Sequence, residues 1–330
     1  MSSNKRLDWI DIAKGYGIVL VILAHLNKWS FNNYIYSFHL PLFFFLSGYV
    51  FKVNNNFVDF LIKKIKGLLV PYFLLGIPMV LFIALYNLKG LKGIKYYSIQ
   101  LLIQKRQFTI WFLTGLFILN VLFYFVEKLF KKDVCIFIVS VIMAGLGLFY
   151  YKNGGLALPW NMDVSFTAMP FFAGGFICKN NKDKIDDLLS KKNDWLFIIL
   201  FALINLVLTY INIKLSGSTL EMYFNVYGQP IITYLAAFAG IFVVVLISKK
   251  FENRIIKYIG RNSLIYFAWH QTIFMPIVDD IFILLKLDVF EPFSTVGSIV
   301  IIAKLVVILV LISICIEIIR KTKLRAYLIK

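Results

Sequence analysis

The sequence predicts an all-α integral membrane protein with about ten transmembrane helices, and its composition and patterning carry that prediction. Hydrophobic residues make up 60% of the 330 residues, charged residues only 16%, and the mean hydropathy is +0.81. A soluble domain averages about 45–50% apolar and about 25% charged residues. Long apolar runs also alternate with short charged gaps along the chain. These features exclude a soluble multidomain enzyme, a disordered chain and a disulfide-built secreted domain.

The predicted spans are the apolar runs long enough to cross a bilayer core about 30 Å thick, which takes ~20 residues per helix. They lie at residues 9–27, 35–52, 68–87, 108–126, 134–151, 164–179, 194–212, 229–247, 262–285 and 295–319. No repeat or long linker divides them, so we predict one membrane domain over residues 1–330. Asp11 and Lys14 interrupt the first run and no small-residue cleavage site follows it, which predicts a retained helix instead of a signal peptide.

Lysine and arginine set the predicted orientation, because cytoplasmic loops of membrane proteins carry an excess of both. With the N-terminus in the cytoplasm, the inner segments hold 24 of these residues and the outer segments nine, so we predict that both termini are cytoplasmic. The loop at residues 89–106 departs from this pattern, and we expect an amphipathic segment there, on the outer leaflet or near the site. The net charge of +18 then reflects loops near anionic membrane lipids, and we expect no nucleic-acid partner.

All three histidines, His25, His39 and His270, fall within predicted spans. An ionisable side chain in the middle of a membrane costs about 2.5–3.5 kcal/mol on insertion scales, so it is a functional candidate by default. The alternative is that each histidine is a hydrogen-bonded packing residue. Three histidines in spans and none in a loop favour the functional interpretation.

Lys14 lies eleven residues before His25, almost three helical turns, so the two side chains share one helix face about 16 Å apart along the axis. We expect them to face one shared polar cavity, with the cation near the cytoplasmic mouth and the imidazole deeper. Such a site would suit a long, phosphate-bearing donor. The alternative is that Lys14 extends to the inner headgroups. Lys304, in the last span, has no acidic partner within helical reach.

The second span and the loop after it contain two further motifs. Residues 37–49 read Ser-Phe-His-Leu-Pro-Leu-Phe-Phe-Phe-Leu-Ser-Gly-Tyr, in which Pro41 frees a backbone carbonyl and Ser47 with Gly48 allows close helix approach. Residues 63–72 read Lys-Lys-Ile-Lys-Gly-Leu-Leu-Val-Pro-Tyr, a basic cluster directly before a helix. A packing seam and a solvated cytoplasmic loop explain these motifs structurally. The functional alternative for the cluster is a phosphate clamp made of lysine point charges.

Taken together, these motifs resemble acyltransferase family 3 of the integral membrane acyltransferases, most closely its short members related to fucose 4-O-acetylases. The family's first motif is a basic residue, ten residues and a histidine, and Lys14 and His25 stand in those positions. Asp-Ile-Ala-Lys-Gly at residues 11–15 is similar to the fucose-acetylase branch. Other similarities lie at residues 38–49, 64–72, 111–113, 170–175 and 260–264, the last followed by His270.

The resemblance implies transfer of an acyl group, usually acetyl, from a cytoplasmic acyl-coenzyme A such as acetyl-CoA. The acceptor is a hydroxyl of an envelope carbohydrate or lipid-linked sugar, and the location is the bacterial cytoplasmic membrane. His25 is then the general base, and Lys14 serves both catalysis and donor binding. Lys64 and Lys66 hold the nucleotide end of the donor, and no metal is implied. Direct attack by the acceptor and an acyl-histidine route both stay open.

Four more residues are candidates for substrate binding: His39, Ser47, Trp111 and His270. His39 would orient His25 or the sugar, since the first two spans are predicted neighbours. Trp111 offers an aromatic face to a sugar ring or acyl chain, or else anchors the chain at the membrane interface. His270 either lines the site or makes a polar contact between packed helices.

A transporter or flippase for a glycolipid or another anionic solute is the alternative function. Ten spans and basic inner mouths suit it, because positive clefts attract phosphates. Transporters often show an internal repeat or broken helices in matching halves, whereas the motifs here cluster in the first 72 residues. A receptor or scaffold would leave Lys14 and His25 unexplained. The sequence therefore favours the acyltransferase.

Overall fold

The structure is a computed structural model that describes residues 7–26, 31–104, 106, 108–190, 194–287 and 294–329, and it confirms the all-α class. Residues 1–6 and 330, at the predicted cytoplasmic ends, lie outside this part. The first half contains α1 (Asp8–Leu26), α2 (Asn32–Tyr36), α3 (His39–Tyr49), α4 (Phe57–Lys64), the π-helical turn η1 (Ile65–Leu69), α5 (Val70–Tyr86), α6 (Gly90–Ile103), α7 (Trp111–Leu129), α8 (Asp133–Lys152), the short 3-10 turn η2 (Pro159–Asn161) and α9 (Met162–Asn180). The second half contains α10 (Lys182–Ser190), α11 (Asp194–Ser216), the 3-10 turn η3 (Met222–Phe224), α12 (Pro230–Lys250), α13 (Arg254–Arg261), α14 (Ser263–Trp269), the π-helical turn η4 (His270–Phe274), α15 (Met275–Leu284), α16 (Thr295–Arg320) and α17 (Arg325–Leu328).

Within the described residues, seven helices are long and apolar enough to cross a membrane, and each matches a predicted span. They are Asp8–Leu26, Phe57–Tyr86, Trp111–Leu129, Asp133–Lys152, Asp194–Ser216, Pro230–Lys250 and Thr295–Arg320. The other three predicted spans are also helical, but they are not among the helices long and apolar enough to cross a membrane. The helix α3 has only 11 residues, α9 has a charged residue in both its first and its last turn, and residues 263–284 are divided by η4. Because α3 and α9 bury most of their residues in protein, lipid thickness does not fix their length.

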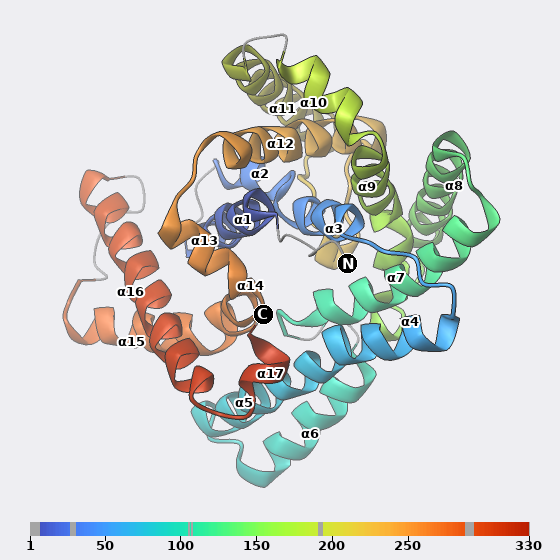
Figure 1. Cartoon of the computed structure of the whole chain (residues 1–330). Coiled ribbons are helices and arrows are strands. Elements are labelled where there is room, and N and C mark those ends of the chain that lie inside the picture. Colours follow the sequence, from blue (N-terminus) through green and yellow to red (C-terminus); the bar gives the residue numbers. More distant parts are fainter. Residues whose placement is uncertain are drawn as a thin grey trace.

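The helices are arranged around α1 and α3, which lie near the centre, while α8, α11 and α16 lie on the outside (Figure 1). Burial agrees with this arrangement. In an 18-residue apolar stretch of α7, 61% is buried inside the protein, but in the corresponding stretches of α8 and α11 only 22% is buried. An apolar face that protein does not cover is the face that lipid solvates. The outer helices therefore separate the inner ones, among them α1 with His25 and α3 with His39, from lipid.

Glycines allow the inner helices to approach at the distance of direct backbone contact. A Cβ atom on Gly48 of α3 would lie 1.9 Å from the backbone oxygen of Phe172 in α9, and one on Gly175 of α9 would lie 1.9 Å from that of Phe45. On the other side of α1, a Cβ on Gly260 of α13 would lie 1.6 Å from the oxygen of Asp11. Small residues at such contacts are how membrane helices gain packing energy. These contacts fix α3 against α9 and α1 against α13.

Lys304 in α16 pairs with an acidic residue of the neighbouring helix. Its Nζ lies 2.8 Å from a carboxylate oxygen of Asp279 in α15 and 5.4 Å from the ring centre of Phe282. Helical spacing within one span could not reveal this partner, because Asp279 precedes Lys304 by 25 residues. The pair explains how a lysine with only 8% of its surface exposed is accommodated within an apolar helix.

Gly48 provides a test of the close helix contacts. Gly48→Ala forces a Cβ against the backbone of α9, and we expect the free energy of unfolding to fall by on the order of 2–3 kcal/mol. The matched control is Gly145→Ala in α8, where a Cβ meets nothing within 4 Å, and alanine there favours the helix by up to about 1 kcal/mol. Thermal unfolding in detergent measures both. Equal Tm values for the two variants would contradict the proposed contact.

Candidate functional site

A cavity of about 750 Å³ is lined by residues of α1, α2, α3, α5, α6, α7, η3, α14, η4 and α15, and all three histidines line it. The ring centres of His25 and His270 are 5.4 Å apart. The ring of Tyr36 lies edge-on to those of His25 and His39, with ring centres 6.2 Å and 5.0 Å apart, respectively. The fold thus brings together three imidazoles from three helical segments. We call this space the histidine cavity.

Backbone contacts fix which nitrogen carries the hydrogen in two of the three imidazoles. Nδ1 of His39 lies 2.9 Å from the carbonyl oxygen of Ile35, and Nδ1 of His270 lies 3.0 and 2.9 Å from those of Tyr266 and Phe267. A carbonyl oxygen only accepts, so Nδ1 is the donor in each neutral ring and Nε2 carries the lone pair. No hydrogen bond from the rest of the described chain fixes the tautomer of His25. Among these three rings, His25 is the one able to adopt either tautomer.

Trp111 and the turn η3 form the aromatic wall of the histidine cavity. Trp111 is only 4% exposed and packs edge-on to Tyr223, with ring centres 5.7 Å apart. The burial of Trp111 disagrees with the alternative of an interfacial anchor and agrees with a cavity wall. Glu221 and Gln271 add polar groups to the lining. This wall can offer both an aromatic face and hydrogen-bond partners to a bound molecule.

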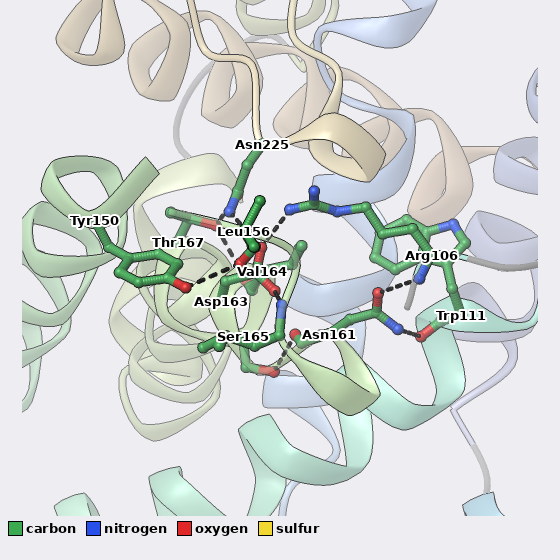
Figure 2. Close-up of polar contacts among 11 residues, drawn as sticks. Arg106, Trp111, Tyr150, Leu156, Asn161, Asp163, Val164, Ser165, Thr167 and Asn225 are labelled. Atoms are coloured by element: carbon green, nitrogen blue, oxygen red, sulfur yellow. Dashed lines mark hydrogen bonds and ion pairs between the residues drawn. The ribbon is translucent and has the colours of Figure 1, made fainter. Parts of the chain in front are cut away.

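A part-buried ion pair holds the loop that carries Tyr223. The guanidinium of Arg106 bonds to the carboxylate of Asp163, to which Asn225 also donates over 3.1 Å (Figure 2). The hydroxyl of Tyr223 donates to the backbone oxygen of Arg106. Burial raises the pKa of Tyr223, so its hydroxyl stays protonated and remains a donor at neutral pH. The pair therefore ties η3 to the start of α9, over the histidine cavity.

Asn161 extends the same network to Trp111. Its side-chain oxygen accepts from the backbone nitrogen of Arg106 at 3.2 Å, and its amide donates to the Trp111 carbonyl at 3.2 Å (Figure 2). The same amide donates to Thr114 at 3.1 Å. These bonds fix the first turn of α7. The two aromatic residues of the cavity wall are thus held by one connected polar network.

A second cavity, of about 530 Å³, is basic. Its lining includes the side chains of Lys14, Lys52, Lys63, Lys64 and Arg261. The predicted donor residues Lys14 and Lys64 therefore lie together, whereas Lys66 is exposed and lies outside the lining. Ser47 also lines this basic cavity, so the structure places it apart from the histidines, and its hydroxyl donates to the Phe43 carbonyl at 2.7 Å.

Two of the cations in the basic cavity are held by neighbouring groups. Nζ of Lys64 lies 5.2 and 5.3 Å from the ring centres of Phe51 and Phe60, a distance at which a cation is attracted to an aromatic face. Arg261 lies 3.3 Å from a carboxylate oxygen of Asp11 and 3.5 Å from one of Asp8. These contacts keep both positive groups at the cavity wall.

An aromatic partition separates the two cavities. Phe43, Phe112 and Phe267 pack on one another with ring centres 5.4–6.2 Å apart, and Phe267 lines both spaces. The prediction that Lys14 and His25 face one shared cavity therefore differs from the structure. Each faces a polar cavity, but apolar rings fill the space between the two. Helical spacing along α1 shows the shared face but not the side chains that α3, α7 and α14 insert against it.

Several residues of the two cavities were not predicted from the sequence. Glu221 and Tyr223 lie in the connection between α11 and α12, which has no periodic pattern. Lys52 was counted only as a loop charge, and Lys63 was part of the basic cluster at residues 63–72 but was not assigned to the donor. Arg261 belongs to the motif at residues 260–264 and could have been assigned from it. Within the described residues, no group of three or more His, Cys, Asp or Glu side chains could hold a metal ion.

The ion pair of Arg106 with Asp163 can be tested by stability. Asp163→Ala leaves a largely buried guanidinium without its carboxylate; breaking a fully buried pair costs about 3–5 kcal/mol, and we expect a loss at the lower end of this range. The control is Asp280→Ala, which removes an exposed carboxylate bonded to Tyr86 and is expected to cost at most about 1 kcal/mol. Thermal unfolding in detergent compares the two variants. A smaller loss for Asp163→Ala would show that the network does not hold this region.

The chain matches a known protein family over most of its length. Residues 7–318 match the model of acyltransferase family 3, described as an acyltransferase domain, and this range contains almost all residues that line the two cavities. No curated protein and no solved structure matches the chain. The match confirms the family that the motifs predicted. The chain therefore belongs to acyltransferase family 3 and is a membrane acyltransferase.

Proposed function

We propose that this protein is an O-acyltransferase of the bacterial cytoplasmic membrane, with acetyl-CoA or another acyl-coenzyme A as donor. The acceptor is a hydroxyl of an envelope carbohydrate or a lipid-linked sugar. The observation that carries the proposal is the pairing of a histidine cavity with a basic cavity across a single aromatic partition. One side has the groups that move a proton, and the other has the groups that bind phosphate. Asp-Ile-Ala-Lys-Gly at residues 11–15 supports a relationship to fucose 4-O-acetylases.

The basic cavity suits the nucleotide end of coenzyme A. Lysine binds phosphate as a point charge, and arginine binds it through paired hydrogen bonds. Lys14, Lys64 and Arg261 supply such groups, and Lys66 extends the positive surface outside the lining. Lys52, Lys63 and Arg261 also belong to segments that the positive-inside pattern assigns to the cytoplasm. Both the charge and the predicted side therefore support a cytoplasmic donor here.

Asn120 supports placement of the pantetheine arm between the phosphates and the partition. Its side-chain oxygen is buried and has no hydrogen-bond partner among the described residues, while its amide donates to Leu116 over 2.7 Å. Asn120 lines the basic cavity. A buried acceptor without a partner is costly, by about 1–3 kcal/mol. The amide N–H groups of a pantetheine arm are donors that would satisfy it.

The acceptor hydroxyl is proposed to lie in the histidine cavity beside His25. As the hydroxyl oxygen attacks the thioester carbon, His25 takes its proton; a C–O bond forms and the C–S bond breaks. The proton then passes from His25 to the thiolate sulfur, which leaves an ester and free coenzyme A. A positioned general base of this kind contributes roughly 10²–10⁴-fold to a rate.

The walls of the histidine cavity support a carbohydrate acceptor. Binding sites for small molecules combine aromatic surface with a few placed polar groups, and Trp111 with Tyr223 provides the aromatic part here. Glu221 can accept hydrogen bonds from hydroxyls, as can Nε2 of His39. His39 is thus proposed to bind the sugar, and Trp111 to stack on it. Ser47, on the other side of the partition, is proposed to contact the donor.

Transport of a glycolipid or anionic solute is the second candidate function. The observation that favours it is the same partition, because two cavities separated by a movable barrier also suit a transporter. Flux of a labelled glycolipid across proteoliposomes in the absence of any acyl-coenzyme A would support transport. Label that enters the glycolipid only when acyl-coenzyme A is present would support the transferase.

Removal of His25 tests the base. We expect His25→Ala to reduce transfer of [¹⁴C]acetyl from acetyl-CoA to host envelope glycolipid by at least about 100-fold, with little change in Tm. The assay uses the purified full chain in lipid nanodiscs. Wild-type transfer by this variant would exclude His25 as the base. Mass spectrometry of the ester would identify the acyl group and the sugar position.

Removal of a cavity lysine tests the donor site. Lys14→Ala and Lys64→Ala each delete one charge from the basic cavity, which should weaken acetyl-CoA binding by about tenfold or more, since a charged hydrogen bond contributes about 1.5–3 kcal/mol. Lys131→Ala is the control, because Lys131 is exposed and pairs with Glu127 at 3.5 Å. Isothermal titration with coenzyme A measures all three. Equal affinities would place the donor elsewhere.

A further inference from the structure

His270 occupies an unusual position for a packing residue. Its side chain is 0% exposed, and it begins the π-helical turn η4 (His270–Phe274). π-helical turns inside longer helices are frequent at functional sites. Nδ1 is fully used by the carbonyls of Tyr266 and Phe267. Nε2 is buried and has no hydrogen-bond partner among the described residues.

The burial of Nε2 decides what it can contact. Less than 1 Å² of this atom is exposed, so in this structure it faces neighbouring side chains and not open space. The nearest aromatic neighbours of the ring are His25, at 5.4 Å between ring centres, and Phe267, at 6.2 Å. Of these two, only His25 carries an N–H group. An acceptor nitrogen with a fixed lone pair thus lies beside the one imidazole of the cavity whose tautomer the described contacts leave open.

We propose that His270 is a positioning residue for the acyl transfer: its Nε2 accepts a hydrogen bond from His25, and this inference rests on the proposed function. With one ring nitrogen of His25 donating to His270, the other is held as the lone pair that faces the acceptor hydroxyl. When His25 takes the hydroxyl proton it becomes positive, and the bond to Nε2 stabilises that charge. A third group that orients a base in this way is a recurring arrangement in group-transfer enzymes.

The hydrogen bond itself is not formed in this structure, in which Nε2 has no partner. Catalytic hydrogen bonds are often long or poorly aligned before substrate binds and tighten in the complex. The two rings are tilted by 41° to each other. The contacts of Nδ1 hold the His270 ring in place, so on this proposal it is the His25 ring that turns about its side-chain bonds to bring an N–H group to Nε2.

Two substitutions separate positioning from packing. His270→Asn retains a donor for the backbone carbonyls but removes the group at Nε2, whereas His270→Gln places an amide oxygen near the Nε2 position. We expect His270→Asn to lower kcat for transfer from [¹⁴C]acetyl-CoA by about 100-fold, with the KM for acetyl-CoA and the Tm near wild type. His270→Gln should recover part of that loss. A packing role predicts the opposite order, because asparagine keeps the helix contact.

A control variant and the wild-type chain distinguish failure of this inference from failure of the proposed function. Ser140→Ala removes a buried side chain that bonds to its own helix at Ile136, as His270 does at Tyr266, but Ser140 lines neither cavity and its loss should leave kcat unchanged. A His270→Asn variant with wild-type kcat, or one whose kcat falls only as far as its Tm and donor affinity fall, would overturn the inference while the transferase stands. A wild-type chain that transfers no label would overturn the proposed function itself.

Discussion

A polar group inside a membrane finds no water, so it must find its partner within the protein, and this constraint explains most of the polar contacts in the structure. Arg106 bonds to Asp163, and Lys304 bonds to Asp279 across two helices. Of the buried side-chain atoms without partners in the described part of the chain, two lie at the cavities. They are Oδ1 of Asn120 and Nε2 of His270, and each belongs to a residue that lines a cavity. On the proposed function, the coenzyme A arm satisfies the first and His25 the second.

The seven long helices were predictable because lipid imposes a length and an apolar composition on any helix that it surrounds. The central helices α3 and α9 are surrounded by protein, so their sequences are apolar for a different reason and their lengths are free to vary. Composition alone cannot separate these two causes. The glycines at which α3 and α9 meet are visible in the sequence, but the backbone atoms that each contacts belong to a distant segment. The close contacts therefore appear only in three dimensions.

In the candidate site too, some residues could be predicted from local sequence and others only from the tertiary fold. The spacing of Lys14 and His25 follows from helical geometry and could be read from the sequence. Lys64 and Lys66 looked equivalent, yet residues two apart on a helix point in nearly opposite directions, so only one of them can line a given cavity. Glu221 comes from a connection without periodicity, and no pattern assigned it to the histidines. Family membership explains the motifs but not these positions.

The aromatic partition explains why the protein has two separate polar cavities instead of one continuous passage. A continuous polar passage through the membrane would let water and ions leak, whereas three packed phenylalanine rings interrupt it. On the proposed function, the charged end of the donor is held in the basic cavity by cations, and only the thioester end needs to reach His25. That end is uncharged and compact, so it is the one part of the donor that apolar rings can admit. Phe267, which lines both spaces, is the ring of the partition that faces the donor side and the acceptor side alike.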